Sequence, residues 1–228
     1  MTIRAVFFDL DGTLLDTASD LAHALNALLE AKGKPALPND TIRRVVSDGA
    51  AALIKLGFNV DDSHESYAAL REELLAIYHD NLSTQTQPFD GIGALIEQLN
   101  QHNIAWGIVT NKPWPYTAPL MQKHLFASEP SAVICPDHVQ EKKPHPEALL
   151  LACKQSNCSA NEAIYIGDHL RDIECGRRAG CDTIAVGYGY IPENEKHTDW
   201  NATHCVTHAD ELWPIIKTYI KKSHEEAL

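Results

Sequence analysis

Five short apolar segments, spread along the chain between residues 5 and 186, most constrain how this sequence can fold. None alternates apolar with polar residues, and an unbroken apolar run is typical of a strand buried on both faces. Helical patterns separate most of them, so the order of elements predicts a parallel, doubly wound α/β sheet. The predicted strands are Ala5–Phe8, Ala105–Val109, Ala132–Cys135, Ala163–Ile166 and Thr183–Val186.

The spacing of apolar residues also predicts the helices that connect the later strands. One of these helices should stop at Gly180, because a glycine is common just past a helix C-terminus. The predicted helices are Ile92–Gln101, Pro119–His124, Pro146–Lys154 and Asp172–Ala179, with one more after His208.

The chain between the first two predicted strands is much longer than a crossover connection requires. Thr17 and Asp20 have the spacing of a capping box for its first helix. We therefore expect residues 16–86 to form an inserted α-helical domain, and residues 1–15 and 87–228 to form the sheet domain. The helices predicted in the insert are Ser19–Lys32, Asp40–Val46, Ala50–Leu56 and His64–Leu82.

The charge balance limits the partners of the chain. With 19 Lys and Arg against 31 Asp and Glu, its net charge is -12, which argues against nucleic acid or an anionic membrane as a partner. A local cation can still reverse the sign within one site, so a small phosphate ester stays possible. We expect a monomer or a weak homodimer.

The cysteines and the N-terminal segment bear on localisation. None of the six cysteines forms a CxxC pair, which favours free thiols in a reducing compartment. The first apolar run is too short for a signal sequence, and no run approaches the ~18 apolar residues of a membrane span. We expect a cytoplasmic protein.

Polar residues follow four of the predicted strands, at the point where each strand ends. The carboxyl ends of parallel strands meet at one edge of a sheet, and ligands bind in the crevice outside that edge. These side chains should therefore converge on one site. They are Asp9, Asp11, Gly12, Thr110, Asn111, Lys143, Asp168 and Asp172.

The acidic members of this set indicate a metal site. Asp9 and Asp11 are two residues apart and repel each other unless a positive charge lies between them. Together with Asp168 they offer the oxygen ligands that Mg²⁺ prefers, with room for a substrate phosphate oxygen. The sequence therefore predicts Mg²⁺ as the cofactor.

The remaining members suit a phosphoryl group. Lys143 supplies positive charge, and Thr110 and Asn111 supply hydrogen bonds. Gly12 lets the backbone bend sharply and turn its amides toward the same oxygens. Each residue taken singly is as well explained by a turn, a helix cap or a solvated surface. Their occurrence together, each after its own strand, favours a phosphate site.

Four motifs carry a resemblance to a known family and span nearly the whole chain. They are DLDGT (Asp9–Thr13), VTNK (Val109–Lys112), KKP (Lys142–Pro144) and GDHLRD (Gly167–Asp172). On these motifs the chain resembles the haloacid dehalogenase-like hydrolases, specifically their phosphatases. The resemblance implies a Rossmann-like core with a helical cap inserted after the first strand.

The resemblance also implies roles in catalysis. Asp9 would be the nucleophile that forms an aspartyl-phosphate, and Asp11 would be the general acid and then the general base. Thr110 and Lys143 would hold the transferring phosphoryl oxygens. These roles describe a phosphoric monoester hydrolase.

The same resemblance implies the surroundings of the metal. Asp168 would bind Mg²⁺ with Asp9 and the backbone carbonyl of Asp11, and Asp172 would orient the site. A phosphosugar mutase or a non-catalytic phosphate-binding module could keep the same core, and both stay open as alternatives.

Stretches such as VTNKPWPYTAPLMQ and GYGYIPENE resemble family members that act on N-acetylmuramic acid 6-phosphate more than those that act on 2-phosphoglycolate. Specificity would come from the insert, where Arg43, Ser47, Asp48 and Gly49 lie in a loop between helices. An arginine there would suit the carboxylate that both substrates carry. Arg43 and its neighbour Arg44 could equally be ordinary solvated helix residues.

Overall fold

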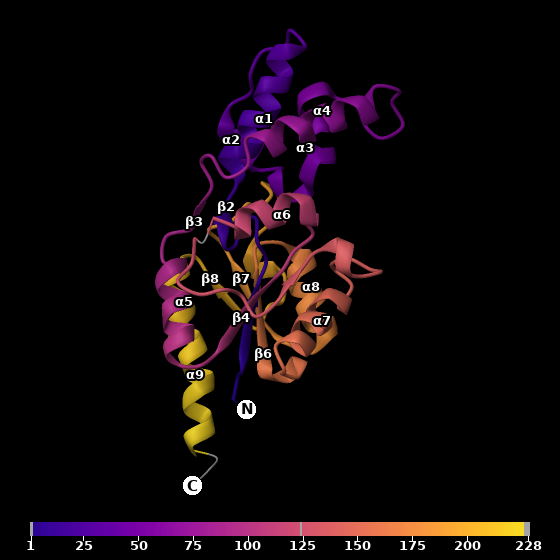
Figure 1. The fold of residues 1–228 in the computed structure, drawn as a ribbon. Coiled ribbons are helices and arrows are strands. Elements are labelled where there is room, and N and C mark those ends of the chain that lie inside the picture. The colour runs from indigo at the N-terminus through magenta and orange to yellow at the C-terminus, as the bar shows by residue number, and fades with distance from the viewer. Residues whose placement is uncertain (1, 124, 226–228) are drawn as a thin grey trace.

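The computed structural model describes residues 2–123 and 125–225, and its centre is a six-stranded sheet with helices on both faces (Figure 1). The strands follow the order β5-β4-β1-β6-β7-β8, and every neighbouring pair is parallel. The predicted fold class is confirmed. The strands are β1 (Ala5–Phe8), β4 (Ala105–Val109), β5 (Val133–Ile134), β6 (Ala163–Gly167), β7 (Asp182–Val186) and β8 (His204–Val206).

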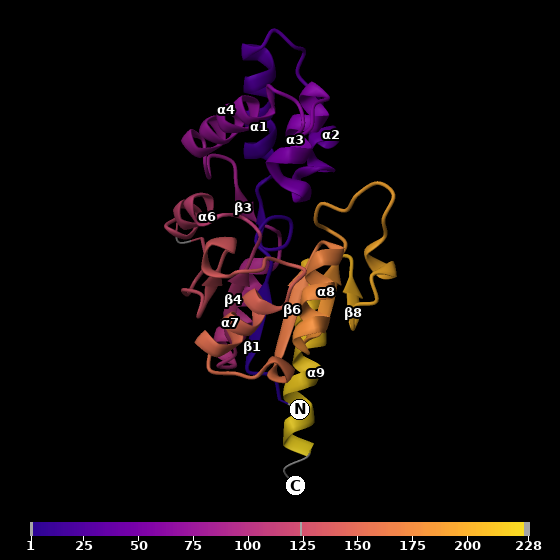
Figure 2. The same cartoon turned by 90° about the vertical axis from the view of Figure 1, so that its right-hand side faces the viewer.

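The central strand β1 shows why the unbroken apolar runs become buried strands. Val6 and Phe8 pack into the cluster on the side of α5 (Ile92–Gln101) and α9 (Leu212–Glu225). Ala5 and Phe7 pack into the cluster that contains α7 (Glu147–Gln155). All four side chains are buried. The sheet therefore has an apolar layer on each face. Figure 2 shows the face that α7 covers, with that helix in front of the strands.

The helices of this part are α5 (Ile92–Gln101), α6 (Trp114–Met121), α7 (Glu147–Gln155), α8 (Leu170–Ala179) and α9 (Leu212–Glu225). The prediction Pro119–His124 is wrong at its start, because α6 already begins at Trp114. Pro115 lies in its first turn, where a missing N–H costs little. His124 lies outside the described residues.

Residues 16–86, here called the helical insert, stand over the end of the sheet where β1 ends (Figure 1). The short strands β2 (Leu15–Asp16) and β3 (Gln87–Pro88) pair antiparallel where the chain leaves and returns. The insert has its own apolar cluster, which Tyr190 of the sheet domain joins. Its helices are α1 (Ala18–Ala31), α2 (Asn39–Arg43), α3 (Gly49–Phe58) and α4 (Tyr67–Asp80), with a 3₁₀ turn at Val46–Asp48.

The expected capping box at the start of α1 is wrong. Thr17 makes no side-chain cap, because its hydroxyl donates to Asp11 Oδ1 at 2.6 Å. Asp20 instead accepts hydrogen bonds from the amides of Gln85 and Thr86, at 2.9 and 3.1 Å, and from the Thr86 hydroxyl. Asp20 therefore fastens the returning chain to the first helix of the insert.

None of the described helices combines the length and the apolar character that crossing a membrane requires.

Candidate active site

The end of β1 brings Asp9 and Gly12 to the edge of the sheet. The Asp9 amide continues the ladder by donating to the carbonyl of Ile166 at 2.9 Å. Gly12 has a φ of 85°, and a Cβ at this position would collide with the Asp168 carboxylate. Only glycine fits this turn. The Gly12 amide donates to Leu15 at 3.0 Å, so it shapes the turn and is not free for a phosphate as the sequence suggested.

Asp9, Asp168 and Asp172 form a cluster in which one oxygen from each carboxylate lies within 4.8 Å of the others. Asp168 and Asp172 are fully buried. Asp168 accepts hydrogen bonds from the Thr13 hydroxyl at 3.1 Å and from the Tyr190 amide at 2.8 Å. These bonds fix its direction and leave the carboxylate close to that of Asp9.

The electrostatics of this cluster favour a bound cation. Burial, reinforced by Asp9 and Asp172, raises the pKa of Asp168 to about 8. Burial also raises the pKa of Asp9, although Lys143 opposes the shift. Both shifts mean that the cluster is short of positive charge. Three carboxylates, two of them fully buried, offer the hard oxygen donors that fit a divalent cation such as Mg²⁺.

Lys143 supplies part of the missing charge. Its Nζ lies 2.7 Å from Asp172 Oδ1 and 2.8 Å from Asp9 Oδ1, and it donates to the Val109 carbonyl. Burial alone would lower the pKa of Lys143, but Asp172 and Asp9 reverse the shift and raise it. The ammonium therefore stays charged beside Asp9.

The end of β4 places Thr110 and Asn111 next to this lysine. Thr110 is buried, and its hydroxyl accepts a hydrogen bond from the Lys112 amide at 3.1 Å. The Asn111 side chain exchanges two hydrogen bonds with the Lys143 backbone, each 3.1 Å long. Asn111 thus fixes the Lys143 loop against the end of β4, which the sequence did not suggest.

Asp11 lies in a separate network that sequence reasoning missed. Lys112 Nζ is 3.0 Å from Asp11 Oδ1 and 2.7 Å from the Tyr78 hydroxyl, and Thr17 donates to the same carboxylate. Burial would lower the pKa of Lys112, but Asp11 and Tyr78 raise it overall. Burial also raises the pKa of Tyr78 to about 12. Lys112 stands in the VTNK motif, whereas Tyr78 becomes visible only once α4 is packed.

A cavity of about 400 Å³ lies between the sheet edge and the helical insert. Asp9, Asp11, Thr110, Asn111 and Lys143 line it from the sheet side. Three of the four residues predicted in the insert loop line it from above. They are Ser47, Asp48 and Gly49.

Arg43 is not among the described residues that line this cavity. Its Nη1 lies 2.7 and 2.8 Å from the two oxygens of Asp16, and its guanidinium stacks over the Tyr190 ring at 4.7 Å. The Tyr190 hydroxyl donates to Asp16 at 2.8 Å and accepts from the Thr17 amide at 2.7 Å. Arg43 therefore belongs to the group of contacts where the chain enters the insert. This group, formed by Asp16, Thr17, Arg43 and Tyr190, is here called the hinge.

Asp48 joins the insert to the sheet domain on the far side of the cavity. It pairs with Arg171 at 2.8 Å and with His169 at 3.6 Å. The nearby His169 ring, together with the charge of Arg171, lowers the pKa of Asp48. The neighbouring Ser47 hydroxyl is buried and has no hydrogen-bond partner within the described residues.

Comparison with protein families now adds to this geometry. Residues 6–186 match the model of the haloacid dehalogenase-like hydrolases. The chain belongs to the haloacid dehalogenase-like hydrolases. The resemblance expected from the four motifs is confirmed. Family membership, together with the phosphatase relatives described next, makes the chain a phosphoric monoester hydrolase.

Two curated relatives and two solved structures illustrate the match. The chain is 42% identical to the N-acetylmuramic acid 6-phosphate phosphatase of Pseudomonas putida, over 95% of this chain and 97% of the relative. It is 39% identical to a phosphoglycolate phosphatase of Xanthomonas campestris, over 92% and 95%. A hydrolase from Pseudomonas syringae superposes with a TM-score of 0.71 at 25% identity, covering 94% and 98%. A predicted phosphoglycolate phosphatase from Haemophilus somnus shares the fold, with a TM-score of 0.81 at 20% identity and coverage of 94% and 98%.

Proposed function

We propose that the chain is a Mg²⁺-dependent phosphomonoesterase that acts through an aspartyl-phosphate on Asp9. The observation that carries the proposal is the position of Asp9, which reaches the cavity and lies 2.8 Å from the charged Lys143. Lys143 and Thr110 would hold the phosphoryl oxygens while an Asp9 oxygen attacks phosphorus. The bond from phosphorus to the ester oxygen breaks in the same step.

Asp11 would transfer the protons in both half-reactions. It gives a proton to the leaving alcohol and then takes one from the water that attacks the aspartyl-phosphate, which frees Asp9 and inorganic phosphate. Lys112 and Thr17 hold the Asp11 carboxylate at 3.0 and 2.6 Å, so they would fix its direction toward the leaving oxygen. The transferred proton is returned to Asp11 within each turnover.

Asp9, Asp168 and the backbone carbonyl of Asp11 would hold Mg²⁺. When bound, the ion would offset the negative charge of the phosphoryl oxygens and of the acidic cluster. Asp172 would orient the site through its contacts with Lys143 and with the His169 amide at 3.1 Å.

We further propose that residues 16–86 act as the cap that selects the substrate, and that the substrate is a small phosphorylated sugar acid. N-acetylmuramic acid 6-phosphate is the favoured candidate and 2-phosphoglycolate the second. The cavity of about 400 Å³ has the usual volume of a pocket for a small-molecule ligand. It is therefore larger than a two-carbon acid requires. Ser47, Asp48 and Gly49 line its cap side, which supports their role in specificity.

The compartment and assembly are part of the same proposal. All six cysteines are free thiols and four of them are buried, which supports a reducing cytoplasm. The small cavity supports a small-molecule partner, and we propose a monomer or a weak homodimer.

The test is phosphate release in the presence of Mg²⁺ from N-acetylmuramic acid 6-phosphate, 2-phosphoglycolate, glucose 6-phosphate and β-glucose 1-phosphate. We expect kcat/KM to favour the muramic ester by about 100-fold, which corresponds to ~2.7 kcal/mol of transition-state discrimination. A similar preference for 2-phosphoglycolate would contradict the choice of substrate only. Isomerisation of β-glucose 1-phosphate without phosphate release would contradict the hydrolase assignment, and no turnover of any ester would favour a binding module.

A further inference from the structure

The residues that line the cavity have a different charge balance from the chain as a whole. The chain carries a net charge of -12, yet the cavity is lined by five Lys and Arg side chains and only three Asp side chains. The acids are Asp9, Asp11 and Asp48, and the cations are Arg71, Lys112, Lys142, Lys143 and Arg171. A cavity with this balance favours a substrate that carries more than one anionic group.

Three of the cations already have acidic partners. Lys143 pairs with Asp9 and Asp172, Lys112 pairs with Asp11, and Arg171 pairs with Asp48. Within the described residues, Arg71 and Lys142 line the cavity without an ion pair to a carboxylate. These two side chains are therefore free to meet an anion of the substrate.

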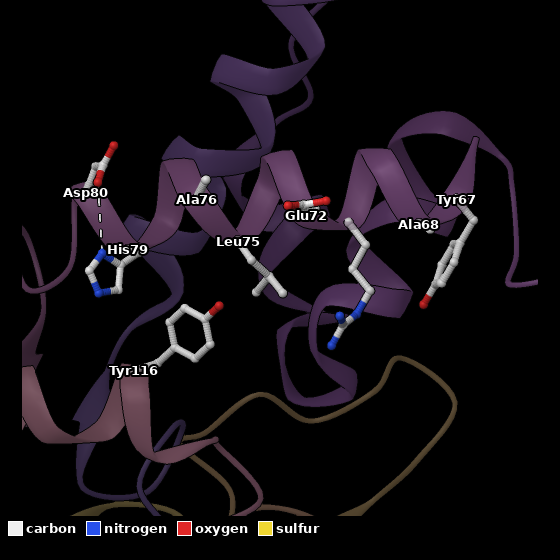
Figure 3. A pocket seen from close by; sticks show the side chains of 9 residues that line it. Tyr67, Ala68, Glu72, Leu75, Ala76, His79, Asp80 and Tyr116 are labelled. Atoms are coloured by element: carbon white, nitrogen blue, oxygen red, sulfur yellow. Dashed lines mark ion pairs between the residues drawn. The ribbon is translucent and has the colours of Figure 1, made fainter. Parts of the chain in front are cut away.

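Lys142 and Arg71 lie at different parts of the cavity. Lys142 precedes Lys143, so it lies on the phosphoryl side of the cavity. Arg71 lies on α4 of the insert and also lines a second, open groove of about 760 Å³ on the side of that helix. Leu75 and Tyr116 line both hollows, and in Figure 3 both point into the space between α4 and α6. Arg71 thus lies where the cavity meets the open groove.

The insert offers a second group that lacks a partner. The Ser47 hydroxyl lines the same cavity and is buried without a hydrogen bond within the described residues. A buried hydroxyl that stays unpaired costs about 1–3 kcal/mol. A polar atom of the substrate would remove that cost.

From these observations we propose that Arg71, assisted by Ser47, binds a carboxylate of the substrate and is the main determinant of specificity. The proposal rests on the phosphatase function above and adds the chemistry that the insert selects. The planar guanidinium matches a carboxylate through two parallel hydrogen bonds. The groove along α4 then receives any part of the substrate that extends beyond the carboxylate.

The test uses a pair of esters that differ only in the 3-O-lactyl group, which carries the carboxylate: N-acetylmuramic acid 6-phosphate and N-acetylglucosamine 6-phosphate. Arg71→Gln should lower kcat/KM for the muramic ester on the order of 100-fold, because a charge-assisted pair is lost. The same variant should change kcat/KM for the glucosamine ester by less than about threefold. Arg71→Lys should give an intermediate kcat/KM for the muramic ester, since it keeps the charge but loses the planar pair of N–H donors.

Arg44→Gln is the matched control, because Arg44 also lies in the insert but pairs with Glu193 at 2.7 Å and is not among the cavity-lining residues. It should leave both esters unchanged. Equal losses for the two esters in Arg71→Gln, or selective loss in Lys142→Gln instead, would overturn this inference alone. A wild-type enzyme that hydrolyses neither ester would overturn the proposed function as well.

Discussion

The edge of the sheet and the helical insert place their site residues in different ways. At the sheet edge, Asp9, Thr110 and Asp168 each follow a strand, and parallel pairing alone brings them together. In the insert, the side chains that face the cavity depend on how each helix is rotated. Arg43 on α2 contacts the hinge, while Arg71 on α4 lines the cavity. We therefore expect topology to place the proposed catalytic residues, and helix packing to place the proposed specificity residues.

The largest effect should come from the sheet edge. Asp9→Asn removes the proposed nucleophile while it keeps the volume, so kcat should fall by about 10⁴-fold or more. Thermal unfolding should show a folded protein, because the change also relieves repulsion within the acidic cluster. Activity above about one per cent of wild type would contradict covalent catalysis by Asp9.

Metal removal should have a similar effect on activity and a distinct effect on stability. EDTA should abolish turnover and Mg²⁺ should restore it. The pKa of Asp168 is raised to about 8 in the folded chain, against about 3.9 for an unfolded aspartate, so the folded state binds this proton more tightly. In EDTA the free energy of unfolding should then fall as pH rises from about 4 to about 8.

Mg²⁺ should reverse that loss, so its effect on Tm should be larger at pH 8 than at pH 5. Thermal unfolding at both pH values, with and without the ion, provides the measurement. An equal Mg²⁺ effect at the two pH values, or full activity in EDTA, would argue against Asp168 as a ligand.

The network between the two regions should give a smaller effect. Lys112→Met removes the ammonium that contacts both Asp11 and Tyr78. We expect kcat to fall about 100-fold, because Asp11, the proposed general acid and base, loses its orientation. Tyr78→Phe removes only the hydroxyl contributed by the insert and should cost less than about tenfold. Steady-state kinetics with the preferred ester separates the outcomes. A change in KM alone would assign Lys112 to substrate binding.

The smallest change in activity should come from the hinge. Arg43→Gln removes an ion pair and a stacking contact that are about one third exposed, so it should lower the free energy of unfolding by about 1 kcal/mol. The ratio of kcat/KM for the two amino-sugar esters should stay at the wild-type value. Selective loss of the muramic ester in this variant would restore the interpretation made from the sequence.

The sequence was most informative where one local rule determines the structure. Unbroken apolar runs located β1 and β4 with their bounds, and four motif residues beyond them line one cavity. They are Asp9, Asp11, Thr110 and Asn111. β8 was missed because it is an edge strand with only Val206 buried. The roles of Asp20 and Tyr78 were missed for another reason, since both depend on contacts between segments far apart in the chain.

Tyr190 connects the proposed metal site to the position of the helical insert. Its amide holds the Asp168 carboxylate at 2.8 Å, while its hydroxyl contacts Asp16 and the start of α1, where the insert begins. Any tilt of the insert that displaces Tyr190 also displaces the hydrogen bond on the carboxylate that would bind the metal. Thermodynamic linkage would then act in both directions: tighter metal binding would favour one position of the insert, and opening of the insert would weaken metal binding.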